Sequence, residues 1–115
     1  MAVIPGCGPD SQTLIDSNTG AKQSKIPYRF DLLPPLALAS VAQVLERGAL
    51  KYGDDNWLPI PVRQHLNHAI MHVLAWMAED EQEDHLAHAA TRILMALERE
   101  AIDIQLLRVE YGEPK

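Results

Sequence analysis

The chain has 115 residues, of which 47% are hydrophobic and 23% are charged, a composition typical of one globular domain. Sixteen acidic residues against ten Lys and Arg give a formal net charge of −6, which argues against binding nucleic acid or an anionic membrane by charge. Cys7 is the one cysteine, so an intrachain disulfide is excluded. Because no signal peptide or membrane-spanning apolar run is evident, we expect a cytoplasmic protein, in the host cytoplasm if it is phage-encoded.

Residues 1 to 24 are rich in Gly, Ser and Thr and poor in bulky side chains. Local burial there cannot offset the entropy cost of ordering the backbone. We therefore expect a flexible N-terminal arm over residues 1 to 24 and one helical domain over residues 25 to 115. No window of the chain alternates apolar and polar residues with β-branched enrichment, so we predict no sheet.

Three segments have helical periodicity, and we predict helices over residues 35 to 51, 62 to 79 and 85 to 109. Prolines stand at the first two starts, and Asp84 is a suitable N-cap for the third helix. Gly53 can adopt the left-handed conformation that ends the first helix. The apolar stripes are Leu38, Val41, Ala42, Leu45 and Ala49, then Leu66, Ala69 or Ile70, Val73 and Met77, and then Leu86, Ala90, Ile93, Leu97, Ala101, Ile104 and Leu107.

The predicted fold class is therefore all-α. Three helices in one layer cannot hide this many apolar stripes from water. A helical bundle completed by homo-oligomerisation, as a homodimer or homotetramer, is the expected solution.

All five histidines lie between residues 65 and 88, and five acidic residues lie between residues 79 and 84. His65, His68 and His72 are three and four residues apart, so they share one face of the second helix. This clustering of imidazoles and carboxylates is the strongest local signal of a functional site.

An antiparallel hairpin that turns near Gln82 would bring Glu79 close to His85, and Trp76 close to His88. Imidazole nitrogens and carboxylate oxygens would then converge, as a divalent-cation site requires. A cation would also remove the mutual repulsion of the carboxylates. The alternative interpretation is that the acidic run is a solvated turn and the histidines are surface or packing residues, and the spacing leaves both open.

Basic residues of the first half face an acidic second half, a polarity that suits a nucleoside triphosphate with a metal ion between its phosphates and the carboxylates. Scattered solubilising charge is the alternative. Two aromatic rings and an amide around the end of the first helix can contact a base, although aromatic residues at such positions also serve as packing. The candidate substrate-binding residues are Lys25, Arg29, Lys51, Tyr52, Asn56 and Trp57.

Five blocks occur in order along the chain, at residues 25–35, 44–53, 56–57, 72–76 and 85–89. They read KIPYRFDLLPP, VLERGALKYG, NW, HVLAW and HLAHA. In this order they resemble the phage-encoded dATP/dGTP diphosphohydrolases, which include the MazZ-like enzymes and are related to the all-α MazG-type nucleotide pyrophosphohydrolases.

The resemblance implies hydrolysis of a purine deoxynucleoside triphosphate, dGTP or dATP, to the monophosphate and pyrophosphate with Mg²⁺ or Mn²⁺. It also implies a role in phage nucleotide-pool remodelling, in which dGMP feeds 2-aminoadenine synthesis. A noncatalytic helical nucleotide-binding or regulatory oligomer is the alternative. Within the expected site we assign catalysis to His72, Glu79 and Asp80. The expected metal-binding residues are Glu46, His72, Glu79, Asp80, Asp84, His85 and His88.

Overall fold

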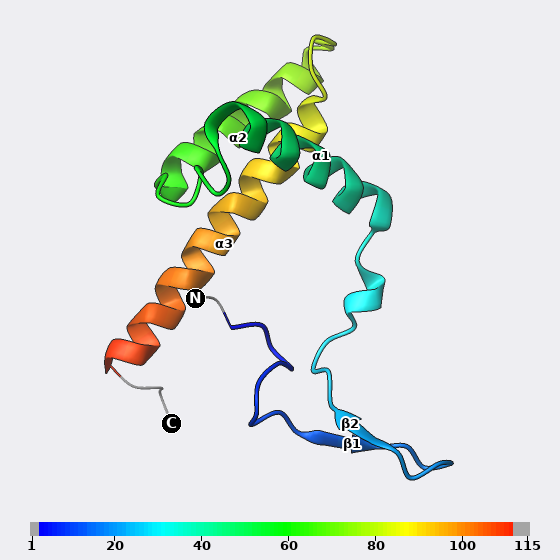
Figure 1. Cartoon of the computed structure of the whole chain (residues 1–115). Helices are drawn as coiled ribbons and strands as arrows, with labels where there is room; N and C mark the ends of the chain where they lie inside the picture. Colours follow the sequence, from blue (N-terminus) through cyan, green and yellow to red (C-terminus); the bar gives the residue numbers. More distant parts are fainter. Residues whose placement is uncertain (1–2, 112–115) are drawn as a thin grey trace. The chain divides into compact units, whose positions relative to one another are not determined.

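The computed structural model describes residues 3 to 111, with side chains up to residue 108. The chain divides into two compact units, Met1–Leu33 and Pro34–Lys115 (Figure 1). The second unit contains the helices and the candidate site.

The first unit contains a short antiparallel hairpin of β1 (Thr13–Ile15) and β2 (Lys22–Ser24), so the prediction of no sheet is wrong. The turn is held by Asp16, whose carboxylate accepts backbone N–H bonds from Asn18 at 2.9 Å and Thr19 at 2.8 Å. These bonds lower the pKa of Asp16. Each strand has three exposed residues, too few for an alternating pattern, so the polar turn is what defines the hairpin. Flexibility of residues 1 to 24 stays a prediction.

A single 3₁₀ turn, η1 (Phe30–Leu32), follows the hairpin in the first unit. The guanidinium of Arg29 forms an ion pair with the carboxylate of Asp31 at 2.7 Å across this turn. This ion pair raises the pKa of Arg29 and lowers that of Asp31.

The second unit consists of α1 (Pro35–Tyr52), α2 (Val62–Met77) and α3 (His85–Tyr111), and all three helices begin where the sequence predicts. Gly53 ends α1 with φ +95° and ψ 157°, a positive-φ conformation that is extended rather than helical and suits glycine alone. Helix α2 ends two residues earlier than predicted because Glu79 adopts φ +62° and turns the chain away. The coarse prediction of a mostly helical protein is confirmed.

Helices α2 and α3 form the antiparallel hairpin that the sequence predicts, and α1 packs on α3 (Figure 1). Helix α3 therefore contacts both other helices. The N-terminus of α3 is capped by Asp84, whose carboxylate accepts the backbone N–H of Ala87 at 3.3 Å, as expected. The cap fixes the turn between α2 and α3, which carries the acidic run.

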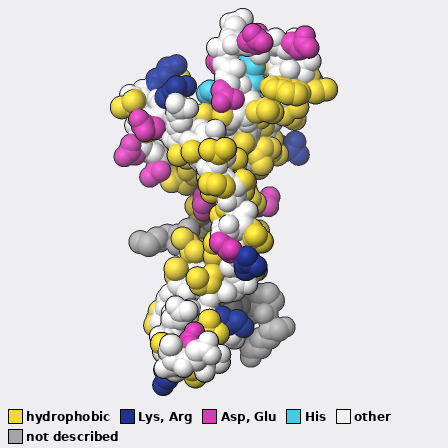
Figure 2. Space-filling view, turned by 90° about the vertical axis from the view of Figure 1, so that its right-hand side faces the viewer, with side chains coloured by type: hydrophobic (Ala, Val, Ile, Leu, Met, Phe, Trp, Pro, Cys, Tyr) yellow, Lys and Arg dark blue, Asp and Glu magenta, His cyan; other side chains and the backbone are white. Residues whose placement is uncertain are grey.

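Small and polar residues fill the interface between α2 and α3. The apolar stripe of α2 is exposed, with Ile70 at 58%, whereas Ala69 is buried together with His65 and His72. On α3 the stripe residue Leu97 is likewise 58% exposed. Figure 2 shows many hydrophobic side chains on the molecular surface. The fold therefore turns His65 and His72 of α2 inward and leaves most of the apolar stripes outward.

In α1 only Val41 of the expected buried face is fully buried, and Leu38 remains 41% exposed. The reason is that α1 packs along α3 alone among the described helices. Completion of the bundle by a second copy of the chain stays a prediction.

Candidate functional site

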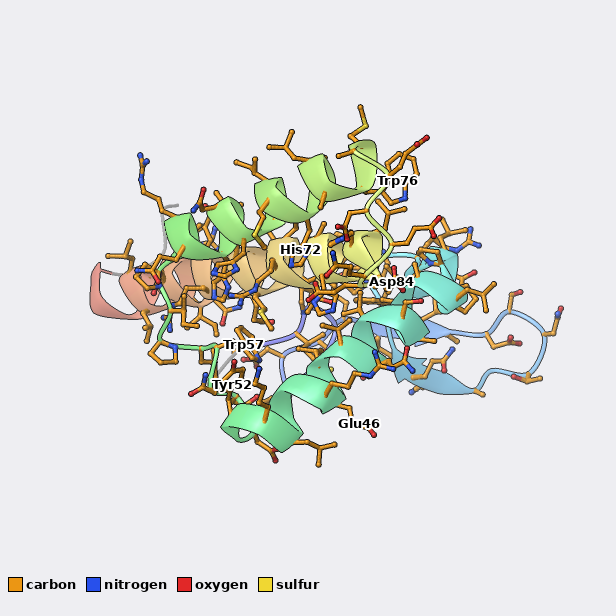
Figure 3. All side chains as sticks on the ribbon, turned by 90° about the horizontal axis from the view of Figure 1, so that it is seen from above. Glu46, Tyr52, Trp57, His72, Trp76 and Asp84 are labelled. Carbon is orange, nitrogen blue, oxygen red and sulfur yellow. The ribbon has the colours of Figure 1, made fainter. Side chains whose placement is uncertain are left out.

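Three histidines meet between the C-terminal half of α2 and the first turns of α3. Nδ1 of His72 lies 3.0 Å from Nδ1 of His85, and the His72 ring stacks on the His88 ring at a centroid distance of 4.9 Å. Figure 3 shows His72 extending from α2 toward α3. His85 and His88 reach the same partner because residues three apart share a helix face. The expected convergence of imidazoles is confirmed, with His72 rather than Trp76 against His88.

Asp80 orients this cluster from the turn. Its carboxylate accepts a hydrogen bond from Nε2 of His85 at 2.7 Å, and this bond is the main cause that lowers the pKa of Asp80. Nδ1 of His85 in turn contacts Nδ1 of His72, and one of these two rings donates the hydrogen bond while the other accepts it. Asp80 thus orients His85, and His85 in turn orients the ring of His72.

Burial lowers the pKa of the His72 imidazole, and the neighbouring His88 lowers it further, while Glu83 has the opposite effect. His72 is therefore neutral at pH 7. A metal ion binds neutral imidazole, so the folded chain holds this side chain in its ligating state.

Glu83 completes the cluster. Its Oε2 lies 3.8 Å from Nδ1 of His72, and one ligand atom each from His72, Glu83 and His88 lies within 4.8 Å of the others. Two imidazoles and one carboxylate are a ligand set of catalytic metal sites, which keep a position open for water or substrate. The donor atoms of these three residues therefore fit a divalent cation.

A cavity of about 840 Å³ opens beside the cluster, and this volume matches that of small-molecule sites. It is bounded by the C-terminal half of α1, the loop that follows α1, and the facing sides of α2 and α3. His72, Glu83 and His88 all line it. The candidate metal centre and the cavity are therefore one site.

The structure divides the expected site residues into three groups. Glu79, Asp80, Asp84 and His85 line a second hollow on the turn, where Asp80 bonds His85 and Asp84 bonds the start of α3. Lys25 and Arg29 belong to the first unit. The expected site residues that line the cavity are Glu46, Lys51, Tyr52, Asn56, Trp57, His72 and His88.

Sequence reasoning did not select Glu83 or Arg92, although both line the cavity. Glu83 belongs to the acidic run, so its position in the sequence signalled it, but spacing could not separate it from its neighbours. Arg92 lies four residues after His88 and thus on the same face of α3, a spacing that could have found it.

The fold and the site define a helical protein with a candidate divalent-cation centre that opens into a cavity large enough for a nucleotide. In the part of the chain that the structure describes, no helix combines the length and apolarity needed to cross a membrane.

Residues 17–106 match the family model described as dATP/dGTP diphosphohydrolase, N-terminal. The match covers most of the sequence, and the chain therefore belongs to the dATP/dGTP diphosphohydrolase family. The name of the family identifies a hydrolase that acts on dATP or dGTP. No curated protein and no solved structure matches the chain.

Proposed function

We propose that the chain hydrolyses dGTP or dATP to the monophosphate and pyrophosphate with a divalent cation held by His72, Glu83 and His88. The observation that carries this proposal is that the three potential ligands line the cavity itself. A triphosphate in the cavity would therefore meet the cation directly. Family membership supplies the substrate class.

Mg²⁺ and Mn²⁺ are the expected ions, and the ligand set favours Mn²⁺ of the two. Mg²⁺ binds oxygen ligands in strict octahedral geometry, whereas two of these three ligands are imidazoles. A bound cation would neutralise phosphate charge and increase the acidity of a water molecule. Asp80 holds the His85 ring by a hydrogen bond, and His85 orients the His72 ring through the contact between their Nδ1 atoms.

The other end of the cavity offers groups for a purine base. The rings of Tyr52 and Trp57 provide stacking surfaces, and the amide of Asn56 can donate to and accept from a base edge. The ammonium of Lys51 lies 5.1 Å from the centroid of the Tyr52 ring. We propose that these four residues bind the nucleotide, with Lys51 available to the phosphates.

We also propose that a second copy of the chain covers the outer apolar stripes of α2 and α3. Ile70, Leu97 and Leu107 are each more than half exposed on these helices, and burial of such side chains is the main favourable term in association. A homodimer or homotetramer would supply this burial.

The proposed setting is the cytoplasm of a phage-infected host. Removal of purine triphosphates there would remodel the nucleotide pool, and dGMP would become available for 2-aminoadenine synthesis. Resemblance to the phage enzymes supports this part of the proposal.

The test is a product analysis with dGTP, dATP and dCTP, each incubated with Mn²⁺, with Mg²⁺ or with excess EDTA. We expect monophosphate and pyrophosphate from the purine substrates, and no turnover in EDTA. Tight nucleotide binding without turnover would instead indicate the noncatalytic regulatory oligomer. Release of inorganic triphosphate, or full activity in EDTA, would contradict the proposal.

A further inference from the structure

Arg92 is a basic residue of the cavity that lies outside the candidate metal centre. It is half-buried in α3, one helical turn beyond His88, and it lines the same cavity as the candidate metal centre. No carboxylate among the described side chains forms an ion pair with its guanidinium. Burial lowers the pKa of Arg92, because desolvation disfavours its charged form.

His65 holds Arg92 in place. The His65 side chain is fully buried, and its Nε2 lies 3.1 Å from the carbonyl oxygen of Trp57. A carbonyl only accepts, so Nε2 carries the proton and donates. NH1 of Arg92 donates to Nδ1 of His65 at 3.1 Å, because a guanidinium has no acceptor. Both ring nitrogens are thus satisfied in one neutral tautomer.

This arrangement agrees with the electrostatics of His65. Burial is the main cause that lowers the pKa of its imidazole, and the nearby charge of Arg92 also lowers it. A neutral His65 adds no charge that could compensate Arg92. The guanidinium is therefore held by a partly buried hydrogen bond, and this bond does not neutralise its charge.

Arg99 on the same helix shows the contrasting case. Its guanidinium donates to the carbonyl oxygen of Leu58 at 3.4 Å and also forms an ion pair with Asp103. Arg99 is thus neutralised by Asp103, whereas Arg92 forms no ion pair with a carboxylate of the described side chains. An arginine that the fold positions inside a cavity and leaves without a counter-ion is suited to bind an anion.

We propose that Arg92, positioned by His65, binds the polyphosphate of the nucleotide beside the metal centre. The guanidinium has five N–H donors, of which one is used by His65, and the others can form the paired bonds that phosphate oxygens accept. His88 and Arg92 are about one helical turn apart along α3, and one turn is about 5.4 Å. Neighbouring phosphates of one nucleotide can therefore contact the cation bound at His88 and the guanidinium of Arg92 together. This inference rests on the proposed function for the identity of the nucleotide.

The first experiment is titration calorimetry of the full chain with inorganic pyrophosphate in the presence of Mn²⁺. Arg92→Gln should raise the Kd of pyrophosphate about 10- to 100-fold, the range for a lost bond to a charged group. Arg92→Lys keeps the positive charge but loses the paired N–H donors of the guanidinium, so it should increase the Kd of pyrophosphate by a smaller factor. Arg63→Gln, an equal charge change on an exposed position of α2, is the matched control and should leave the Kd within about twofold.

The second experiment tests the role of His65 as a positioning residue. The double variant of His65→Gln and Arg92→Gln should lose no more pyrophosphate affinity than Arg92→Gln alone, because His65 acts through Arg92. Additive losses would contradict positioning. If His65→Gln does not fold, Arg92→Lys provides the test. An equal pyrophosphate Kd for Arg92→Lys and the wild type would show that the paired N–H donors of the guanidinium, which His65 orients, are not needed.

Steady-state kinetics with dGTP separate this inference from the proposed function. Suppose that the wild type hydrolyses dGTP and that a folded Arg92→Gln variant keeps the wild-type KM and pyrophosphate affinity. This result would overturn the role of Arg92 and leave the proposed function intact. Pyrophosphate binding that depends on Arg92, in a wild type that hydrolyses no dGTP, would uphold the anion site and refute the proposed function. We expect a raised KM for Arg92→Gln and an unchanged melting temperature.

Discussion

Glu83→Gln is the sharpest single change for the candidate metal centre. It keeps the size of the side chain and removes the one carboxylate among the three clustered ligands. We expect the variant to fold with the wild-type melting temperature in the absence of metal, because the Glu83 side chain is 53% exposed. Binding of Mn²⁺ should weaken, and the stabilisation that Mn²⁺ confers on the folded chain should fall with it.

The magnitude follows from charge and exposure. Two unit charges ~4 Å apart attract by about 1 kcal/mol in bulk water and by about 4 kcal/mol at an effective dielectric constant of ~20. Because Glu83 is exposed, the attraction of about 1 kcal/mol in bulk water is the better starting value. The double charge of the cation raises this attraction to about 2 kcal/mol. Because a coordinated oxygen lies closer than ~4 Å to its cation, the half-saturating concentration of Mn²⁺ should increase at least about 30-fold, since ~1.4 kcal/mol is a factor of 10.

The assay is Mn²⁺ binding by electron paramagnetic resonance, followed by initial rates of dGTP hydrolysis against Mn²⁺ concentration. Glu81→Gln is the matched control, because Glu81 belongs to the same turn but lies outside the clustered ligands. An equal loss of Mn²⁺ affinity in the two variants would show that only the total charge of the turn matters. An unchanged affinity in Glu83→Gln would refute the ligand assignment.

Further predictions concern pH, assembly and substrate preference. Burial lowers the pKa of His65 and His72 below the usual 6.5, so the unfolded chain binds more protons in acid, and the melting temperature should fall as the pH drops below 6.5. A melting temperature that is constant from about pH 8 to about pH 5 would contradict this. Leu97→Glu should convert a dimer or tetramer to a smaller species in light scattering, and a monomeric wild type at micromolar concentration would exclude the assembly. Asn56→Ala should change the ratio of kcat/KM for dGTP and dATP, whereas an equal loss for dCTP with a lower Tm would assign Asn56 to folding.

The helices could be predicted from the sequence because their start signals are local. Proline at Pro35 and Pro61 and the carboxylate of Asp84 act within one turn, whatever the rest of the chain does. The end of α2 is different, because it depends on the positive φ of Glu79, which no residue preference announces. The β1–β2 hairpin was missed because its stability comes from turn bonds and not from an apolar face.

The inward face of α2 could not be predicted from periodicity alone. Apolar spacing favours burial of Ile70 and its neighbours, but α3 approaches the opposite side of the helix and buries His72 there. The sequence indicated the histidine cluster correctly, since its members share helix faces. It could not rank the acidic residues, because the turn geometry alone decides that Glu83 faces His72 while Asp80 bonds His85.

The position of Mn²⁺ in crystals of the chain grown with Mn²⁺, located by anomalous scattering, tests the metal centre directly. We predict a peak that is coordinated by His72, Glu83 and His88 at about 2.0–2.2 Å, facing the cavity. A peak bound instead by Glu79 and Asp84 on the outer hollow, with none at the histidine cluster, would contradict the assignment of His72, Glu83 and His88 as the metal ligands.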